Sequence, residues 1–67
     1  MSKLTEYIRS RGLTVNLVAQ KAGITRQALS NYGVLFTPTA RTLTKVAAAM
    51  TELGVKTKIV DLVEAME

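Results

Sequence analysis

Four polar residues lie along one edge of a predicted helix in the first half of the chain: Arg26, Gln27, Ser30 and Asn31. Their spacing of i, i+1, i+4 and i+5 brings them to the same side of an α-helix. An arginine can pair with both major-groove acceptors of a guanine, and glutamine and asparagine can both donate to and accept from an adenine. These residue types at this spacing predict a helix edge that contacts bases in a DNA major groove. The alternative is a solvated polar face with no binding role.

The sequence offers little material for catalysis or metal binding. It contains no histidine and no cysteine, so it lacks the commonest general base, a thiol nucleophile and the ligands of a zinc cluster. Its five carboxylates are dispersed along the chain, and it has no glycine-rich phosphate loop. We therefore expect a protein that is not an enzyme and that needs no metal, cofactor or small-molecule ligand.

The basic residues are concentrated in residues 1–45. This part carries seven Lys or Arg side chains against one acidic residue, a net charge of +6, whereas residues 46–67 carry a net charge of −2. A basic region of this kind indicates a polyanionic partner, although a total charge of +4 is also common on ordinary protein surfaces. The candidate contacts to DNA phosphates among the basic residues are Lys3, Arg9, Arg11, Lys21, Arg41 and Lys45.

Two short helices are expected to position the polar edge, over residues 15–22 and 26–32, with Gly23 in the turn between them. Thr14 and Thr25 precede the two helices, and a threonine hydroxyl at such a position accepts a hydrogen bond from a first-turn amide. Glycine suits the turn because it adopts a positive φ without a steric penalty.

Further helices are predicted on both sides of this pair. Residues 3–11 form one, closed by Gly12, and a longer one follows Thr39 and ends before Gly54, with apolar residues at i, i+3, i+4 and i+7. The segment KTKIVDLVEAME, residues 56–67, also shows helical spacing, with Thr57 as the candidate cap. The competing pattern there is a strand, in which Val55, Thr57 and Ile59 alternate, and we favour the helix because its apolar stripe is longer.

An unusual apolar stretch lies in the loop before the long helix. Three consecutive apolar residues rarely face water without a reason, so we expect them either to fold back onto the core or to contact another subunit. The apolar side of the last predicted helix is a second candidate for a contact with another subunit. The candidate contacts of a homodimer are Val34, Leu35, Phe36, Val60 and Met66.

The segment VAQKAGITRQALSNY (residues 18–32) resembles the helix-turn-helix of phage Cro proteins and of repressor amino-terminal domains. A small residue, Ala19, is followed four positions later by Gly23, then by a hydrophobic residue and by Leu29. PTARTLTKVAAAM (residues 38–50) is similar to the next helix of that family. Two features depart from its pattern: the loop after residue 32 carries no charge, and Leu17 stands where a polar residue is usual.

The resemblance implies that residues 26–32 form the recognition helix, with Arg26, Gln27 and Asn31 facing base edges and Ser30 close by. It also implies backbone contacts near helix N-termini. These are Thr14, Asn16, Thr25 and Arg41, which join Lys21 and Lys45 in the predicted phosphate-contacting set.

The sequence thus predicts a single all-α domain over residues 1–67, a bundle of five short helices of the lambda-repressor-like class. The expected function is that of a Cro-type transcriptional repressor, which binds double-stranded operator DNA as a homodimer. Its expected location is the cytoplasm of a bacterial or phage-infected cell, because residues 1–15 contain no continuous apolar run and no stretch approaches the roughly 20 residues that span a bilayer. The alternatives are a protein-interaction module, such as an antitoxin-type regulator, and a C-terminal segment that lies on a membrane surface, which the acidic balance of that segment disfavours.

Overall fold

Five α-helices make up the part of the chain that the computed structural model describes, residues 3–35 and 37–67, and no β-strand is present there. The helices are α1 (Lys3–Ser10), α2 (Val15–Ala22), α3 (Arg26–Asn31), α4 (Ala40–Glu52) and α5 (Ile59–Met66). The prediction of an all-α bundle is confirmed, and the C-terminal segment is helical rather than extended. The predicted dimer contact at Phe36 lies outside the described residues.

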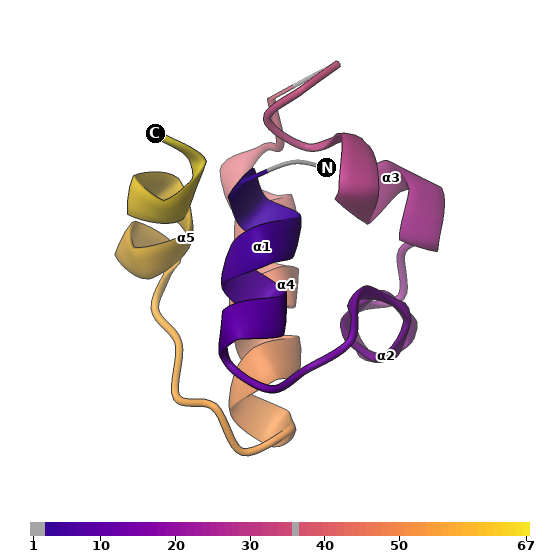
Figure 1. Cartoon of the computed structure of the whole chain (residues 1–67), viewed down its shortest axis with the longest axis vertical. Helices are drawn as coiled ribbons and strands as arrows, with labels where there is room; N and C mark the ends of the chain where they lie inside the picture. Colours follow the sequence, from indigo (N-terminus) through magenta and orange to yellow (C-terminus); the bar gives the residue numbers. More distant parts are fainter. Residues whose placement is uncertain (1–2, 36) are drawn as a thin grey trace.

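The helices surround a small core to which each of them contributes. The long α4 packs against α2 and α5, and α1, which lies in front of α4 in this view, packs against α5, α2 and α3 (Figure 1). α2 and α3 lie on the side of the bundle away from α5. The core has almost no aromatic content, so aliphatic side chains fill it. The largest fully buried side chains are Leu4, Ile8, Val18, Leu29, Val46, Met50 and Leu62.

Local hydrogen bonds fix α2 and α3 where the sequence predicted them. The Thr14 hydroxyl accepts from the Leu17 N–H at 3.1 Å, and the Thr25 hydroxyl accepts from the Ala28 N–H at 3.0 Å. Gly23 has a φ of 76°, which lets the following Ile24 N–H donate back to the Ala19 carbonyl at 3.0 Å. Both caps and the left-handed turn are therefore confirmed.

Three predicted helices end one residue earlier than expected, and one of them is α4, which ends at Glu52 with Leu53 as its C-cap. α1 ends at Ser10, because the Arg11 and Gly12 amides donate to carbonyls three residues back in a tightened turn. α3 ends at Asn31, because Tyr32 leaves the helix with an extended backbone and buries its side chain. The buried ring of Tyr32 therefore belongs to the core.

The start of α5 differs from the prediction. Thr57 does not cap it, because α5 begins at Ile59 and Thr57 stands one residue before the cap position, where its hydroxyl donates to the Val55 carbonyl at 2.8 Å. Lys58 is the N-cap residue, and since an ammonium group can only donate, the cap is made by the Asp61 carboxylate, which accepts from the Lys58 N–H at 2.9 Å. The apolar side of α5 that faces the core is also narrower than the apolar spacing in the sequence predicts. Of the residues of α5, Leu62 is the buried one.

Among the described residues, no helix has the length and apolar character that a membrane crossing requires.

Candidate nucleic-acid interface

α3 presents a polar outer edge and an apolar inner one. Arg26 and Gln27 are exposed, Ser30 and Asn31 are half-buried, and Leu29 on the inner side is fully buried. The structure thus brings the four predicted base-contacting residues together on one helix that packs on α1 and α2. α3 lies at the margin of the bundle, on the side away from α5 (Figure 1).

A hollow of about 160 Å³ lies beside this edge, at the N-terminus of α2. It is lined by Arg9, Leu13, Thr14, Val15, Asn16 and Arg26. The first-turn amides of Val15 and Asn16 have no hydrogen-bond partner within the described residues, because the Thr14 hydroxyl caps the Leu17 amide instead. Free amides at the positive end of a helix dipole, next to two guanidinium groups, form a surface that attracts an anion.

The electrostatics of the hollow are one-sided. Two arginines line it and no carboxylate does. Arg26 belongs both to the hollow and to the first turn of α3, so its guanidinium can reach either a phosphate or a base edge. The structure therefore joins the predicted base-contacting edge to a predicted backbone contact, Asn16, in one continuous region.

The two capping threonines are already engaged within the chain. Their hydroxyl oxygens accept from the Leu17 and Ala28 amides, which leaves their hydroxyl hydrogens as donors. Their first effect on this region is thus to hold the N-termini of α2 and α3 in place.

The remaining predicted phosphate contacts lie elsewhere. The Lys21 ammonium pairs with the Glu52 carboxylate of α4 at 3.8 Å, with both side chains largely exposed. Arg41 and Lys45 are exposed on α4. The structure does not place these three cations in the hollow.

The loop after α3 carries two exposed apolar side chains. The amides of Val34 and Leu35 both donate to the Asn31 carbonyl at 3.0 Å, which folds the chain into a tight turn. Val34 is 62% exposed and Leu35 is 72% exposed, so neither folds back onto the core. The prediction that this stretch folds back onto the core is therefore wrong for Val34 and Leu35.

The two predicted dimer contacts on α5 differ in exposure. Val60 is exposed on α5, whereas Met66 is half-buried and packs against the core, close to Gly33. A Cβ atom at Gly33 would lie 3.6 Å from the Met66 side chain. Met66 therefore has a packing role inside this chain.

Sequence reasoning did not foresee that Arg9 shares a site with Arg26. Arg9 is one of the six candidate phosphate contacts, and a cation in the last turn of α1 also suits the helix dipole. Only the path of the chain from α1 into α2 brings it to the hollow.

The described residues contain no cluster of three or more side chains of the kinds that bind metal ions.

Comparison of the chain with models of protein families, with curated proteins and with solved structures finds no match.

Proposed function

We propose that this protein is a sequence-specific repressor of Cro type that binds a pseudo-palindromic operator in double-stranded DNA as a homodimer. In this proposal α2 and α3 act as a helix-turn-helix, and α3 enters the major groove. Gln27, Ser30 and Asn31 contact base edges, and Arg9, Asn16 and the free amides of α2 contact phosphates. Arg26 lies between the two sets.

One observation carries the proposal. The outer edge of α3 holds residue types that pair with base edges, and it adjoins a hollow with two arginines, free helix amides and no carboxylate. Phosphate contacts set the register of a protein on DNA, and base contacts beside them provide specificity. The two kinds of contact are adjacent here, as binding in a groove requires.

The homodimer follows from size. The described chain measures 28 Å in its longest direction. Half-sites in operators of this type lie about 34 Å apart, one turn of the DNA helix. One chain cannot contact both, and one short recognition helix contacts too few base pairs for specific binding by itself.

Selection of duplexes from a random pool tests the proposal, followed by binding titrations with the selected duplex and a scrambled one. We expect a two-fold symmetric consensus. Arg26→Ala and Gln27→Ala should each lower the preference for the selected duplex by about 5- to 150-fold, the equivalent of one lost paired contact of about 1–3 kcal/mol. Arg26→Ala should also weaken binding to the scrambled duplex, because Arg26 lines the hollow.

Gln20→Ala is the matched control, because Gln20 is exposed on α2 but lies outside α3 and the hollow. It should bind both duplexes as the unmodified protein does. If Arg26→Ala and Gln27→Ala also bind both duplexes like the unmodified protein, the assignment of the recognition helix is wrong.

A second candidate function is that of a protein-interaction module, such as an antitoxin-type regulator whose main partner is another protein. The exposed turn with Val34 and Leu35 favours it. A titration of duplex binding against salt separates the two functions: phosphate contacts make DNA affinity fall steeply as salt rises, and a protein-only module shows no duplex binding to lose.

A further inference from the structure

α5 presents an apolar edge on the surface of the protein. Ile59, Val60 and Val63 are 39%, 54% and 38% exposed, and their spacing of i, i+1 and i+4 puts them on one side of the helix. Leu62 anchors α5 to the core from its other side. Nothing in the described part of the chain covers the exposed edge.

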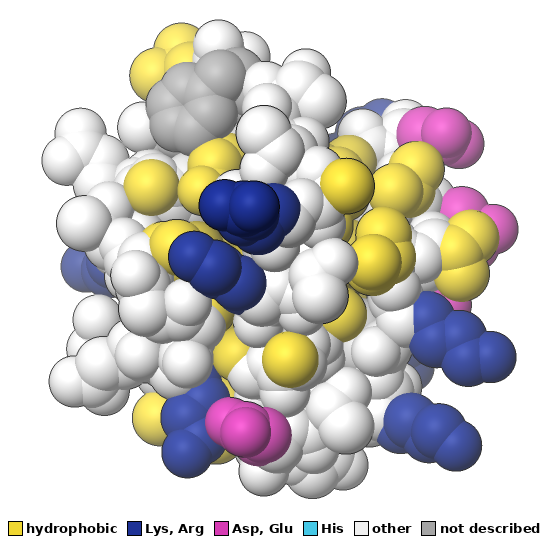
Figure 2. Space-filling model, turned by 180° about the vertical axis from the view of Figure 1, so that it is seen from behind, with side chains coloured by type: hydrophobic (Ala, Val, Ile, Leu, Met, Phe, Trp, Pro, Cys, Tyr) yellow, Lys and Arg dark blue, Asp and Glu magenta, His cyan; other side chains and the backbone are white. Residues whose placement is uncertain are grey.

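Charged residues flank this edge with opposite signs at its two ends. Lys56 and Lys58 stand at the N-terminal end of α5, and Glu64 and Glu67 stand at its C-terminal end. Figure 2 shows the apolar atoms over α5 between acidic atoms above and basic atoms below. None of these four side chains forms an ion pair within the described residues, although Lys3 donates to the main-chain oxygen of Glu67.

This order of charge is unfavourable for an isolated helix. The N-terminus of a helix carries partial positive charge and its C-terminus partial negative charge, so lysines belong at the end and glutamates at the start. Asp61 in the first turn is the exception, and it serves as the cap. A second copy of α5 packed antiparallel would make the same charges favourable, because each lysine-bearing end would lie beside a glutamate-bearing end of the other copy.

We infer that the exposed edge of α5 is the homodimer interface, where Ile59, Val60 and Val63 pack against the same residues of a second, antiparallel copy. The occupant is another copy of this chain because its own α5 supplies the matching apolar edge and the complementary charges at both ends. A two-fold axis between antiparallel helices makes such a contact self-complementary. This inference deepens the proposed function, since it specifies the interface of the dimer proposed there.

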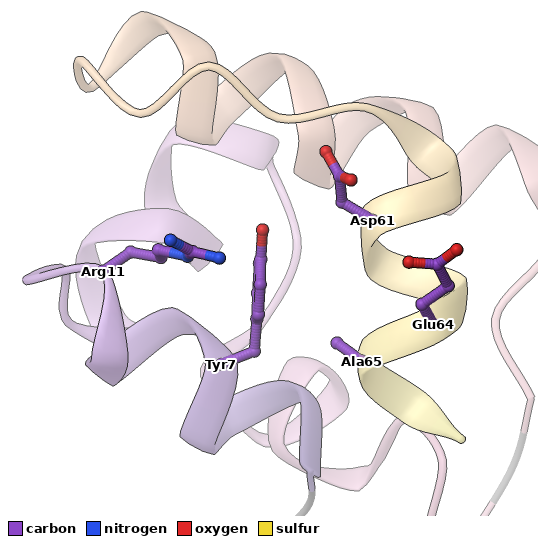
Figure 3. Close-up of a pocket in the computed structure, with 5 residues that line it drawn as sticks. All are labelled: Tyr7, Arg11, Asp61, Glu64 and Ala65. Carbon is purple, nitrogen blue, oxygen red and sulfur yellow. The ribbon is translucent and has the colours of Figure 1, made fainter.

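A hollow next to α5 contains Glu64, one of the two glutamates near the C-terminal end of this helix. It measures about 280 Å³, lies between α1 and α5, and is lined by Tyr7, Arg11, Asp61, Glu64 and Ala65. Figure 3 shows the Tyr7 ring between the Arg11 side chain, whose guanidinium carbon lies 4.9 Å from the ring centroid, and the carboxylates of Asp61 and Glu64. Glu64 belongs to the end of α5 that an antiparallel copy would approach with its lysines, whereas Asp61 lies in the first turn and accepts from the Lys58 N–H.

The turn with Val34 and Leu35 is a weaker candidate for self-association. It is more exposed, but it carries no charge that a second copy could complement. The α5 contact itself is small, because an eight-residue helix is about 12 Å long and cannot alone bury the roughly 1,200 Å² of a stable specific interface. The dimer is therefore weak and sensitive to the charges at its ends.

Sedimentation equilibrium of charge-swapped variants tests this inference. In the first variant Lys56→Glu and Lys58→Glu make both ends of α5 acidic, and in the second Glu64→Lys and Glu67→Lys make both ends basic. Each variant alone should dimerise at least tenfold more weakly than the unmodified protein. An equimolar mixture of the two should associate to within about threefold of the unmodified protein, because unlike charges again meet at both ends. Added salt should weaken the unmodified dimer.

Several results would overturn the inference: an unmodified protein that stays monomeric, variants that dimerise unchanged, a mixture that does not associate, or a dimer that salt strengthens. Circular dichroism checks that each variant folds. Should a charge variant fail to fold, Val60→Ser replaces it, because Val60 is 54% exposed and its truncation leaves the core intact. Leu35→Ser is the matched control and should leave dimerisation unchanged.

Failure of this inference is distinguishable from failure of the proposed function. The first charge-swapped variant should still prefer a half-site of the selected sequence over a scrambled half-site at high protein concentration, since α3 is unaltered. If the unmodified protein dimerises as described but prefers no duplex, the inference stands and the proposed function is wrong.

Discussion

Replacement of Gly23 by alanine should destabilise the protein through backbone strain alone. Gly23 has a φ of 76°, a conformation that costs a residue with a Cβ about 1–2 kcal/mol. A Cβ added at this position meets no atom within 4 Å, so no clash contributes to the loss. Alanine also lowers the entropy of the unfolded chain, which offsets part of this cost by about 0.4–1 kcal/mol. The net loss expected for Gly23→Ala is therefore about 1 kcal/mol.

Thermal and urea unfolding of Gly23→Ala measure this loss. For a domain of this size, 1 kcal/mol corresponds to a fall in Tm of about 4–8 °C. The urea midpoint should decrease at an unchanged m-value, because the folded structure and the surface it exposes on unfolding stay the same. Gly23→Asn should cost less than alanine, since asparagine tolerates the left-handed conformation better.

Ala48→Gly supplies the scale for this experiment, because Ala48 is exposed within α4 and glycine there costs about 1 kcal/mol in helix propensity. A Gly23→Ala protein as stable as the unmodified one, measured beside a destabilised Ala48→Gly protein, would refute the strained turn between α2 and α3.

Three further predictions concern the anchor of α5, a phosphate contact and the ion pair. Leu62→Ala should cost about 2–5 kcal/mol, a large part of the roughly 3–10 kcal/mol available to a chain of this length, and a strong loss of thermal stability is the expected observation. Arg41→Ala should reduce the slope of log affinity against log salt in duplex titrations by about 0.9, and an unchanged slope would remove Arg41 from the phosphate contacts. Glu52→Gln should change stability by less than about 0.5 kcal/mol in urea unfolding, because its pair with Lys21 is long and exposed.

The elements that the sequence predicted best are those fixed by local hydrogen bonds. Thr14 and Thr25 each cap an amide three residues further on, and Gly23 closes a turn of adjacent residues. Such contacts depend on a few neighbouring residues, and residue type largely decides them. The bounds of α2 therefore agree with the prediction, and on α3 Arg26 and Gln27 are exposed whereas Ser30 and Asn31 are half-buried.

The features that the sequence did not predict depend on how the chain folds back on itself. Thr57 has the side chain of a helix cap, yet it bonds to Val55 because the loop after α4 turns back at that point, where the Thr51 hydroxyl also accepts from the Thr57 amide at 3.2 Å. The hollow that joins Arg9 to Arg26 requires α1 and α3 to pack on each other, which no local spacing encodes. Periodicity alone also cannot tell a side chain that faces its own core from one that faces a second copy, as in Val63.

A weak dimer contact is consistent with the proposed function. Two half-sites on one duplex hold two chains close together, so the second chain binds at a high effective concentration even when the free proteins are mostly monomeric. Contact through α5 alone then contributes cooperativity on a correctly spaced operator, and it contributes nothing on an isolated half-site. Specificity in this arrangement comes from two sources: the bases that each α3 contacts, and the spacing that lets two copies of α5 meet. The charges at the ends of α5 would therefore affect the choice of operator although they lie on the side of the bundle away from α3.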